Sequence, residues 1–191
     1  MSVKTIAEFQ VSHHQILNET GTLTGECPDF AKDEKHLLKV YEMMVLTRTF
    51  DAKAIALQRT GKLGTYPSTL GQEAIGVAIG AAMQTEDVLC PYYRELGAQF
   101  WRGVKLEEIF AFWGGEEEGS NYQGPREDFP ICIPIASQTL HATGVALAMK
   151  LKKERRAAVG VIGDGGTSRG DFYESMNAAG VWQLPLVFVV N

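Results

Sequence analysis

The segment from Ala157 to Asn191 constrains the fold more than any other part of this chain, because it has the order strand, glycine turn, helix, strand. Its two apolar runs, at 157–162 and 186–190, have the length and composition of strands buried on both faces of a parallel sheet. Ser168 and Asp171 predict a capping box at the start of the intervening helix, and Pro185 follows the end of that helix. We therefore expect an α/β fold in which a parallel sheet is flanked by helices and the turn lies at the carboxyl edge of the sheet.

The turn itself, Gly163-Asp164-Gly165, has the composition of a phosphate site that includes a metal ion. Glycines let a phosphate approach the backbone, and a helix N-terminus attracts anions. Asp164 would repel a bare phosphate, but a divalent cation between the two groups removes the repulsion. Two commoner phosphate loops are excluded: a dinucleotide fingerprint needs glycine in place of Ser168, and a Walker loop needs lysine in place of Gly166. The residues alone leave an ordinary structural turn open.

The rest of the chain is expected to supply further helices and a polar N-terminal arm. Helical periodicity at 33–60 begins at a capping residue, Asp33, and ends at Gly61. More helices are expected at 71–83, 106–113 and 139–152, a short strand at 88–89, and a loop at 114–126. The helix at 71–83 is rich in small residues, which suits either a subunit interface or close internal packing. Residues 1–32 are predicted to be an arm that lies on a partner.

Composition narrows the class of protein. A net charge of -5 without a basic stripe argues against nucleic-acid binding, and 45% apolar residues are ordinary for a globular domain. No apolar run approaches the about 18 residues that span a membrane, and no signal peptide is recognisable. The three cysteines lack metal-ligand spacing and indicate a reducing compartment. We expect a cytoplasmic protein, with a removed transit peptide as the alternative.

Several motifs together resemble the alpha subunit of the thiamine diphosphate-dependent 2-oxo acid dehydrogenases, the decarboxylating first components of the pyruvate, branched-chain and acetoin complexes. Three segments resemble the thiamine diphosphate motif of this family: Gly163-Asp164-Gly165, residues 167–174 and residues 180–185. Upstream motifs follow in the order of the family at 59–66, 71–74, 92–95 and 134–138. The resemblance covers about Asp33 to Asn191 and implies that residues 33–191 form a thiamine diphosphate-binding domain, incomplete at its C-terminus.

The resemblance also implies roles in binding the cofactor. Asp164 would ligate Mg²⁺, and Gly165 and Gly166 would offer backbone amides to the diphosphate. Arg94 would bind the terminal phosphate, and Tyr93 would donate its hydroxyl. A Tyr-Arg pair without this context would be read as part of a surface ion pair.

Two further assignments rest wholly on the resemblance. Ile133 and Ile135 stand where backbone groups of the family hold the aminopyrimidine, although their side chains alone indicate a core. Pro134, Ser137 and Gln138 resemble a potassium-binding loop of some relatives. No catalytic residue is expected in this chain, because the glutamate that activates the cofactor comes from the beta subunit in this family.

The activity implied is oxidative decarboxylation of a 2-oxo acid, with transfer of the acyl group to a lipoyl acyltransferase partner in an α2β2 assembly. Pyruvate is the expected substrate, and branched-chain 2-oxo acids or acetoin are the alternatives. In this family the motif closes with an asparagine shortly after the position of Asn191, and members are nearly twice as long. The chain thus resembles an N-terminal fragment that we expect to be inactive alone, which leaves open an interaction domain without activity. A transketolase-type synthase fits the motifs less well.

Overall fold

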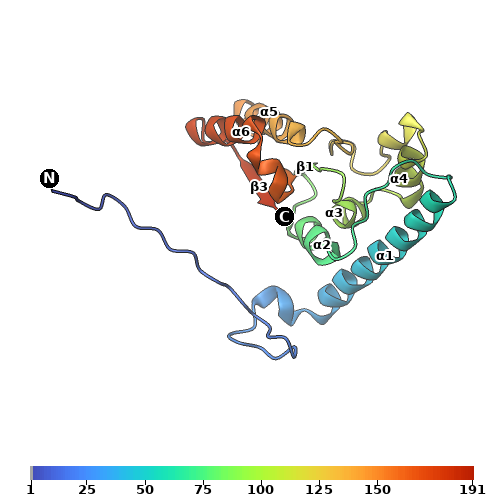
Figure 1. Cartoon of the computed structure of the whole chain (residues 1–191), viewed down its shortest axis with the longest axis horizontal. Coiled ribbons are helices and arrows are strands. Elements are labelled where there is room, and N and C mark those ends of the chain that lie inside the picture. Colours follow the sequence, from blue (N-terminus) through green and yellow to red (C-terminus); the bar gives the residue numbers. More distant parts are fainter. Residues whose placement is uncertain (1) are drawn as a thin grey trace. The chain divides into compact units, whose positions relative to one another are not determined.

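The computed structural model describes residues 2–191 and shows an α/β fold around a three-stranded parallel sheet. The strands are β1 (Val88–Cys90), β2 (Ala158–Ile162) and β3 (Leu186–Val190), in the spatial order β1-β2-β3. Figure 1 labels β1 and β3. The register aligns Cys90 with Gly160 and Gly160 with Phe188. Because both pairs are parallel, the carboxyl ends of the strands meet at one edge, as the sequence predicts.

Helices cover both faces of this sheet. The α-helices are α1 (Glu34–Arg59), α2 (Glu73–Ala82), α3 (Leu96–Trp101), α4 (Leu106–Trp113), α5 (Ser137–Lys152) and α6 (Gly170–Val181). Three 3₁₀ segments are η1 (Asp29–Lys32), η2 (Glu117–Ser120) and η3 (Asp164–Ser168). Every helix expected from the sequence is present within a few residues of its predicted bounds, whereas α3 and the 3₁₀ segments were not predicted.

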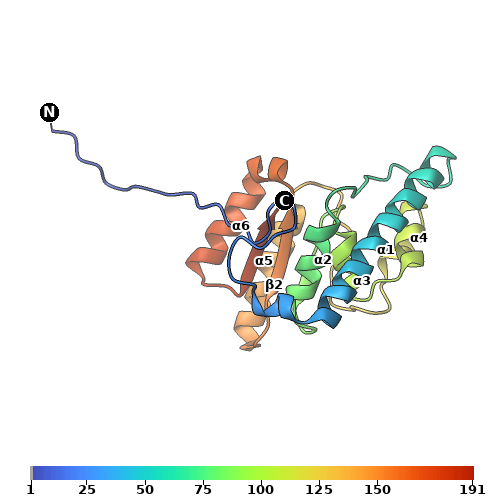
Figure 2. The ribbon, with the colours of Figure 1, turned by 90° about the horizontal axis from the view of Figure 1, so that it is seen from below.

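The alternation of side chains along the strands explains this layering. Leu89, Val159 and Val161 point to the face covered by α2 and α3, where they pack with Ile79 and Ala98. The residues between them face α5, as a second core of Val88, Cys90, Ala158, Ala142, Ala146 and Met149 shows. Figure 2 shows β2 between α5 and α2. β2 is therefore buried along its whole length, as expected for a central parallel strand.

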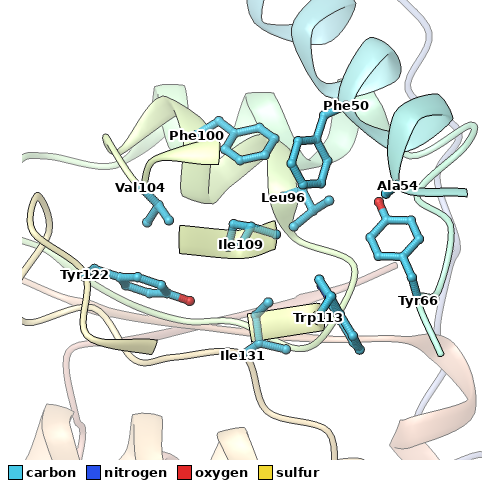
Figure 3. Close-up of a cluster of buried hydrophobic side chains, with 10 residues drawn as sticks. All are labelled: Phe50, Ala54, Tyr66, Leu96, Phe100, Val104, Ile109, Trp113, Tyr122 and Ile131. Carbon is cyan, nitrogen blue, oxygen red and sulfur yellow. The ribbon is translucent and has the colours of Figure 1, made fainter. Parts of the chain in front are cut away.

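A third core joins α1, α3 and α4 through aromatic side chains (Figure 3). The ring of Phe50 stacks on Phe110 at 4.2 Å between centroids and meets Phe100 edge-on at 5.1 Å. Tyr66 and Trp113 extend the cluster with their rings 5.7 Å apart. This core holds α1 against α3, the helix that directly follows the segment 92–95.

The ends of α1 follow local sequence signals. The carboxylate of Asp33 accepts hydrogen bonds from the amides of Lys35 at 3.0 Å and His36 at 3.2 Å, so the predicted N-cap is confirmed. Gly61 ends the helix in the left-handed region at φ 73°. None of the helices in residues 2–191 combines the length and apolar content that crossing a bilayer requires.

Two local predictions were wrong. Ser168 does not cap α6, because its hydroxyl donates to the carbonyl of Gly165 at 2.9 Å inside η3, while the Asp171 carboxylate accepts from Arg169. β3 is not buried on both faces, since Val187 is 51% and Val190 49% exposed. β3 is an edge strand of the described sheet, and composition alone does not distinguish an edge strand from a central one.

The small residues of α2 serve internal packing. A Cβ atom on Gly80 would lie 2.8 Å from the Cβ of Trp101, and one on Gly97 would lie 2.8 Å from the amide nitrogen of Val77. These distances are shorter than real Cβ contacts allow, so α2 and α3 can only approach this closely through glycine. Of the two alternatives left open by the sequence, internal packing is observed on this side of α2.

The chain divides into two compact units, Met1–Lys39 and Val40–Asn191. The first contains a small turn in which the side chain of Asn18 accepts hydrogen bonds from the amides of Thr20 at 3.0 Å and Thr22 at 2.8 Å. Among residues 2–39, four large apolar side chains are more than nine-tenths exposed: Val3, Ile6, Phe9 and Val11. The second unit contains the whole sheet and the candidate site.

Candidate functional site

A cavity of about 270 Å³ contains all of the predicted cofactor residues except Ile133. The predicted residues that line it are Tyr93, Arg94, Ile135, Asp164, Gly165 and Gly166. They are joined by Gln72, Tyr92, Gln138, Ile162, Gly163 and Asn191. Five separate segments of the chain meet there, at the carboxyl edge of the sheet, because β2 and β3 end beside each other.

A larger cavity, of about 350 Å³, is a weaker candidate. It lies beside Asp87, which directly precedes β1, and therefore beside the amino end of that strand. Its buried charges already satisfy each other: Arg102 donates to Asp128 at 2.9 Å and to the carbonyl of Asp87 at 2.6 Å. Asp128 also accepts from the amide of Leu89 at 2.9 Å. The polar groups of this cavity hold the fold together.

The loop after β2 presents an unpaired carboxylate to the smaller cavity. The backbone amide of Asp164 donates to the carbonyl of Asn191 at 2.7 Å, which fixes the start of η3 against the end of β3. The side chain of Asp164 is exposed and forms no ion pair or hydrogen bond within residues 2–191. Its oxygens are therefore open to a ligand from the cavity.

The two glycines of the loop have different environments. The amide of Gly166 donates to the carbonyl of Gly163 at 2.9 Å, whereas the amide of Gly165 has no acceptor in the described part of the chain. A Cβ atom on Gly166 would lie 2.7 Å from Cγ1 of Ile162. No heavy atom lies within 4 Å of the same position on Gly165. The loop thus has an open amide at Gly165 and a tightly packed backbone at Gly166.

Arg94 supplies a positive charge that no carboxylate in residues 2–191 neutralises. Its guanidinium donates to the backbone carbonyl of Ser68 and lies 5.5 Å from the centroid of the Tyr93 ring. No ion pair of Arg94 is found in residues 2–191, so the alternative of a surface ion pair is wrong. Tyr93 packs edge-on against Tyr92, with 5.1 Å between ring centroids. A guanidinium held in this way can attract an anion into the cavity.

Only part of the segment before α5 lines the cavity. Ile133 and Ile135 are about half exposed, at 48% and 50%, and only Ile135 lines the cavity. Ala136 is buried in the left-handed region at φ 72°, directly before α5. Gln138 donates from Nε2 to the carbonyl of Val161 at 2.8 Å, and its buried Oε1 has no hydrogen-bond partner in the part of the chain that the structure describes. A role for this segment in binding potassium stays a prediction.

Sequence reasoning missed several residues that the structure places at or beside the cavity. Tyr92 donates its hydroxyl to Gln72 at 3.4 Å, and burial raises the pKa of Tyr92. Glu95 is only 1% exposed and accepts a hydrogen bond from the side chain of Asn191 at 2.8 Å. Burial raises the pKa of Glu95 to about 7, against the opposing effect of the Asn191 hydrogen bond. No sequence pattern marks a buried glutamate, because burial depends on packing from distant segments.

The donor set fits a hard cation held by few protein ligands. The described residues contain no group of three or more histidine, cysteine, aspartate or glutamate side chains able to hold a metal ion. Mg²⁺ commonly takes one or two carboxylates and completes its shell with phosphate oxygens and water. Asp164 on one side and Arg94 on the other are therefore suited to a Mg²⁺-bound phosphate ligand.

Comparisons with known proteins agree on one family. Residues 41–191 match the family described as Dehydrogenase E1 component. The pyruvate dehydrogenase E1 component subunit alpha of Acholeplasma laidlawii is 39% identical over 174 residues, which is 91% of this chain and 50% of that protein. The subunit of the same name from Bacillus subtilis is 38% identical over 179 residues, 93% of this chain and 48% of that protein. The chain spans about half the length of the curated relatives it matches.

This chain also resembles one solved structure, that of a putative thiamin diphosphate-dependent enzyme isolated from Mycobacterium smegmatis. The similarity covers 62% of this chain and 20% of the chain of that enzyme. The identity is 18% and the TM-score 0.38, too low to carry an argument.

Proposed function

Because the chain belongs to the Dehydrogenase E1 component family, we propose that it forms part of an enzyme for the oxidative decarboxylation of a 2-oxo acid, with pyruvate as the substrate. The similar curated proteins are named pyruvate dehydrogenase E1 component subunit alpha, which supports the alpha-type role and the choice of pyruvate. Branched-chain 2-oxo acids and acetoin are the alternative substrates.

The cofactor in this proposal is thiamine diphosphate with Mg²⁺. The observation that carries it is the cavity in which Asp164 and Arg94, distant in sequence, face a common space and neither has an ion-pair partner in residues 2–191. Asp164 would hold the metal, and Arg94 and Tyr93 would hold the terminal phosphate. The open amide of Gly165 would donate to the diphosphate, and Gly166 would keep the loop close to Ile162 and Ile135. When bound, thiamine diphosphate supplies the electron sink that lets a 2-oxo acid lose carbon dioxide.

In this proposal the residues of this chain bind and orient the cofactor. The titratable and charged side chains that line the cavity are Tyr92, Tyr93, Arg94 and Asp164, with no histidine or glutamate. We therefore assign proton transfer to a beta-type partner in an α2β2 assembly, and acceptance of the acyl group to a lipoyl acyltransferase. Ile133 and Ile135 would place backbone groups against the aminopyrimidine.

In the same proposal the chain consists of a cofactor-binding domain and an N-terminal arm. Residues 33–191 form the thiamine diphosphate-binding domain, and residues 1–32 form an arm that lies on a partner subunit. The exposure of Val3, Ile6, Phe9 and Val11 supports the proposal that the arm lies on a partner. Closely spaced apolar side chains are stabilised when another surface buries them.

Titration calorimetry with thiamine diphosphate and MgCl₂ tests the cofactor assignment on the full-length protein with its beta-type partner. Saturable, Mg²⁺-dependent binding is expected. Decarboxylation assays on pyruvate and 3-methyl-2-oxobutanoate then distinguish the substrates. A protein that assembles with the partner but takes up no cofactor would instead be an interaction domain, and the proposal would be abandoned.

A further inference from the structure

Glu95 differs from the other buried carboxylates of the second unit in having neither a cationic partner nor a second hydrogen-bond donor. Glu108 accepts from the amides of Lys105 and Gln123, both at 2.8 Å. Glu73 is paired with Arg48, and Asp128 is paired with Arg102. Asp51 accepts hydrogen bonds from three residues of the segment 66–69. Glu95 is 1% exposed and has one donor, Nδ2 of Asn191 at 2.8 Å. An ionised carboxylate in this position would be poorly compensated for its loss of water.

The two side chains also carry matching unsatisfied atoms. Oε2 of Glu95 and Oδ1 of Asn191 are both buried, and neither has a hydrogen-bond partner in the described residues. Both are acceptors while Glu95 is ionised, so they cannot bond to each other. A proton on Oε2 turns that oxygen into a donor, and a carboxylic acid and a carboxamide can then exchange two hydrogen bonds.

We propose that Glu95 is a positioning residue that, as a neutral carboxylic acid, forms a reciprocal pair of hydrogen bonds with the Asn191 carboxamide and so holds the loop that carries Asp164. The backbone of Asn191 makes the connection: its amide donates to the carbonyl of Ile162 at 3.0 Å, and its carbonyl accepts from the amide of Asp164 at 2.7 Å. Glu95 directly follows Arg94 in the chain. The pair thus joins the segment that carries the phosphate-binding arginine to the loop that carries the metal-binding aspartate. The inference rests on the proposed function, because it concerns the same cavity.

The surrounding charges do not provide another partner for Glu95. Tyr92, Tyr93 and Arg94 belong to its own segment, and Asp164 lies on the same cavity, but only Asn191 forms a hydrogen bond with its carboxylate. β2 and β3 carry no titratable side chain. α2, which packs against α3, carries only Glu73, and Arg48 neutralises it. Burial accordingly raises the pKa of Glu95 from 4.5 to about 7, in agreement with the geometry.

The raised pKa of Glu95 determines how the stability of the folded protein changes with pH. Between pH 4.5 and about pH 7 the folded protein retains the Glu95 proton that the unfolded chain loses. Its contribution to stability is therefore complete below this range and decreases as pH rises through it. Above the range Glu95 is ionised in both states, and the second hydrogen bond to Asn191 is lost.

Glu95→Gln tests the proposal, because glutamine offers the same donor and acceptor as the neutral acid and cannot ionise. The thermal midpoint of the full chain is measured without cofactor from about pH 5 to about pH 8. The midpoint of Glu95→Gln is expected to rise relative to that of the wild type across this interval. The matched control Glu107→Gln removes an exposed carboxylate and should follow the wild type. Parallel curves for Glu95→Gln and the wild type, or a lower midpoint of Glu95→Gln at every pH, would overturn the neutral pair.

The positioning role has its own readout in the dissociation constant of thiamine diphosphate with Mg²⁺, measured with the beta-type partner. For the wild type this constant is expected to rise by about threefold or more as Glu95 ionises, whereas that of Glu95→Gln should stay constant. Asn191→Ala should also remove the pH dependence and weaken binding throughout. A wild-type dissociation constant that does not change with pH would overturn the positioning role. A protein that never binds the cofactor would refute the proposed function and leave the thermal test of the pair intact.

Discussion

Gly166 packs so closely on Ile162 that a Cβ atom at Gly166 would lie 2.7 Å from Cγ1 of the isoleucine. The neighbouring Gly165 has open space in the same direction. This difference separates two roles of glycine in one loop: Gly166 allows the loop to pack on the sheet, and Gly165 leaves room for a ligand to reach the backbone.

Gly166→Ala is expected to lower the free energy of unfolding by about 1–3 kcal/mol, because the methyl group displaces Ile162 and Ile135. Gly165→Ala should change the free energy of unfolding by less than about 0.5 kcal/mol and still weaken binding of thiamine diphosphate. Urea denaturation and titration calorimetry measure the two effects. Equal destabilisation by both substitutions would contradict the assignment.

Asp164→Ala is expected to abolish Mg²⁺-dependent binding of thiamine diphosphate, because the cavity then has no carboxylate for the metal. Calorimetry with and without MgCl₂ checks this expectation. Glu107→Ala, which removes an exposed carboxylate on α4, is the control and should bind as the wild type does. An unchanged affinity of Asp164→Ala would remove the metal site from the proposal.

Arg94→Ala is expected to raise the dissociation constant of thiamine diphosphate by about tenfold or more, which corresponds to one charge-assisted contact of about 1.5–3 kcal/mol. The same titration measures it, with Lys53→Ala on the exposed side of α1 as a control for the loss of one positive charge. A change of equal size in the two variants would point to net charge in place of a specific phosphate contact.

Asp51→Ala is expected to lower the free energy of unfolding by about 3 kcal/mol, because two buried donors and one part-buried donor lose their acceptor. The carboxylate accepts from the hydroxyl of Tyr66 at 2.8 Å, the hydroxyl of Ser68 at 2.8 Å and the amide of Thr69 at 2.7 Å. Since the carbonyl of Ser68 holds Arg94, cofactor binding should weaken as well. Thermal unfolding and calorimetry of one preparation measure both. A weaker affinity without a lower midpoint would mean that Asp51 acts on the site directly.

The sequence by itself determined the elements whose signals are local. Asp33 and Gly61 mark the ends of α1 because a capping carboxylate and a left-handed glycine act within one helical turn. Two continuous apolar runs, separated by a glycine turn and a helix, were sufficient for the β2-α6-β3 crossover and its parallel pairing, but not for η3. The residues assigned to the cofactor from the family motifs all line the cavity except Ile133, whereas Tyr92 and Asn191 line it without having been assigned.

Tertiary structure alone decided burial and the choice of hydrogen-bond partner. Ser168 had the sequence of a capping residue but bonds to Gly165, because the loop after β2 turns through η3 before α6 begins. Val187 reads as a core residue but is half exposed, because β3 lies at the edge of the described sheet. Nothing in the sequence marks Glu95 as buried, yet it is 1% exposed and accepts a hydrogen bond from Asn191, which follows β3. Each of these outcomes depends on which distant segments meet, and the free energy of such contacts is not encoded in any single stretch of the chain.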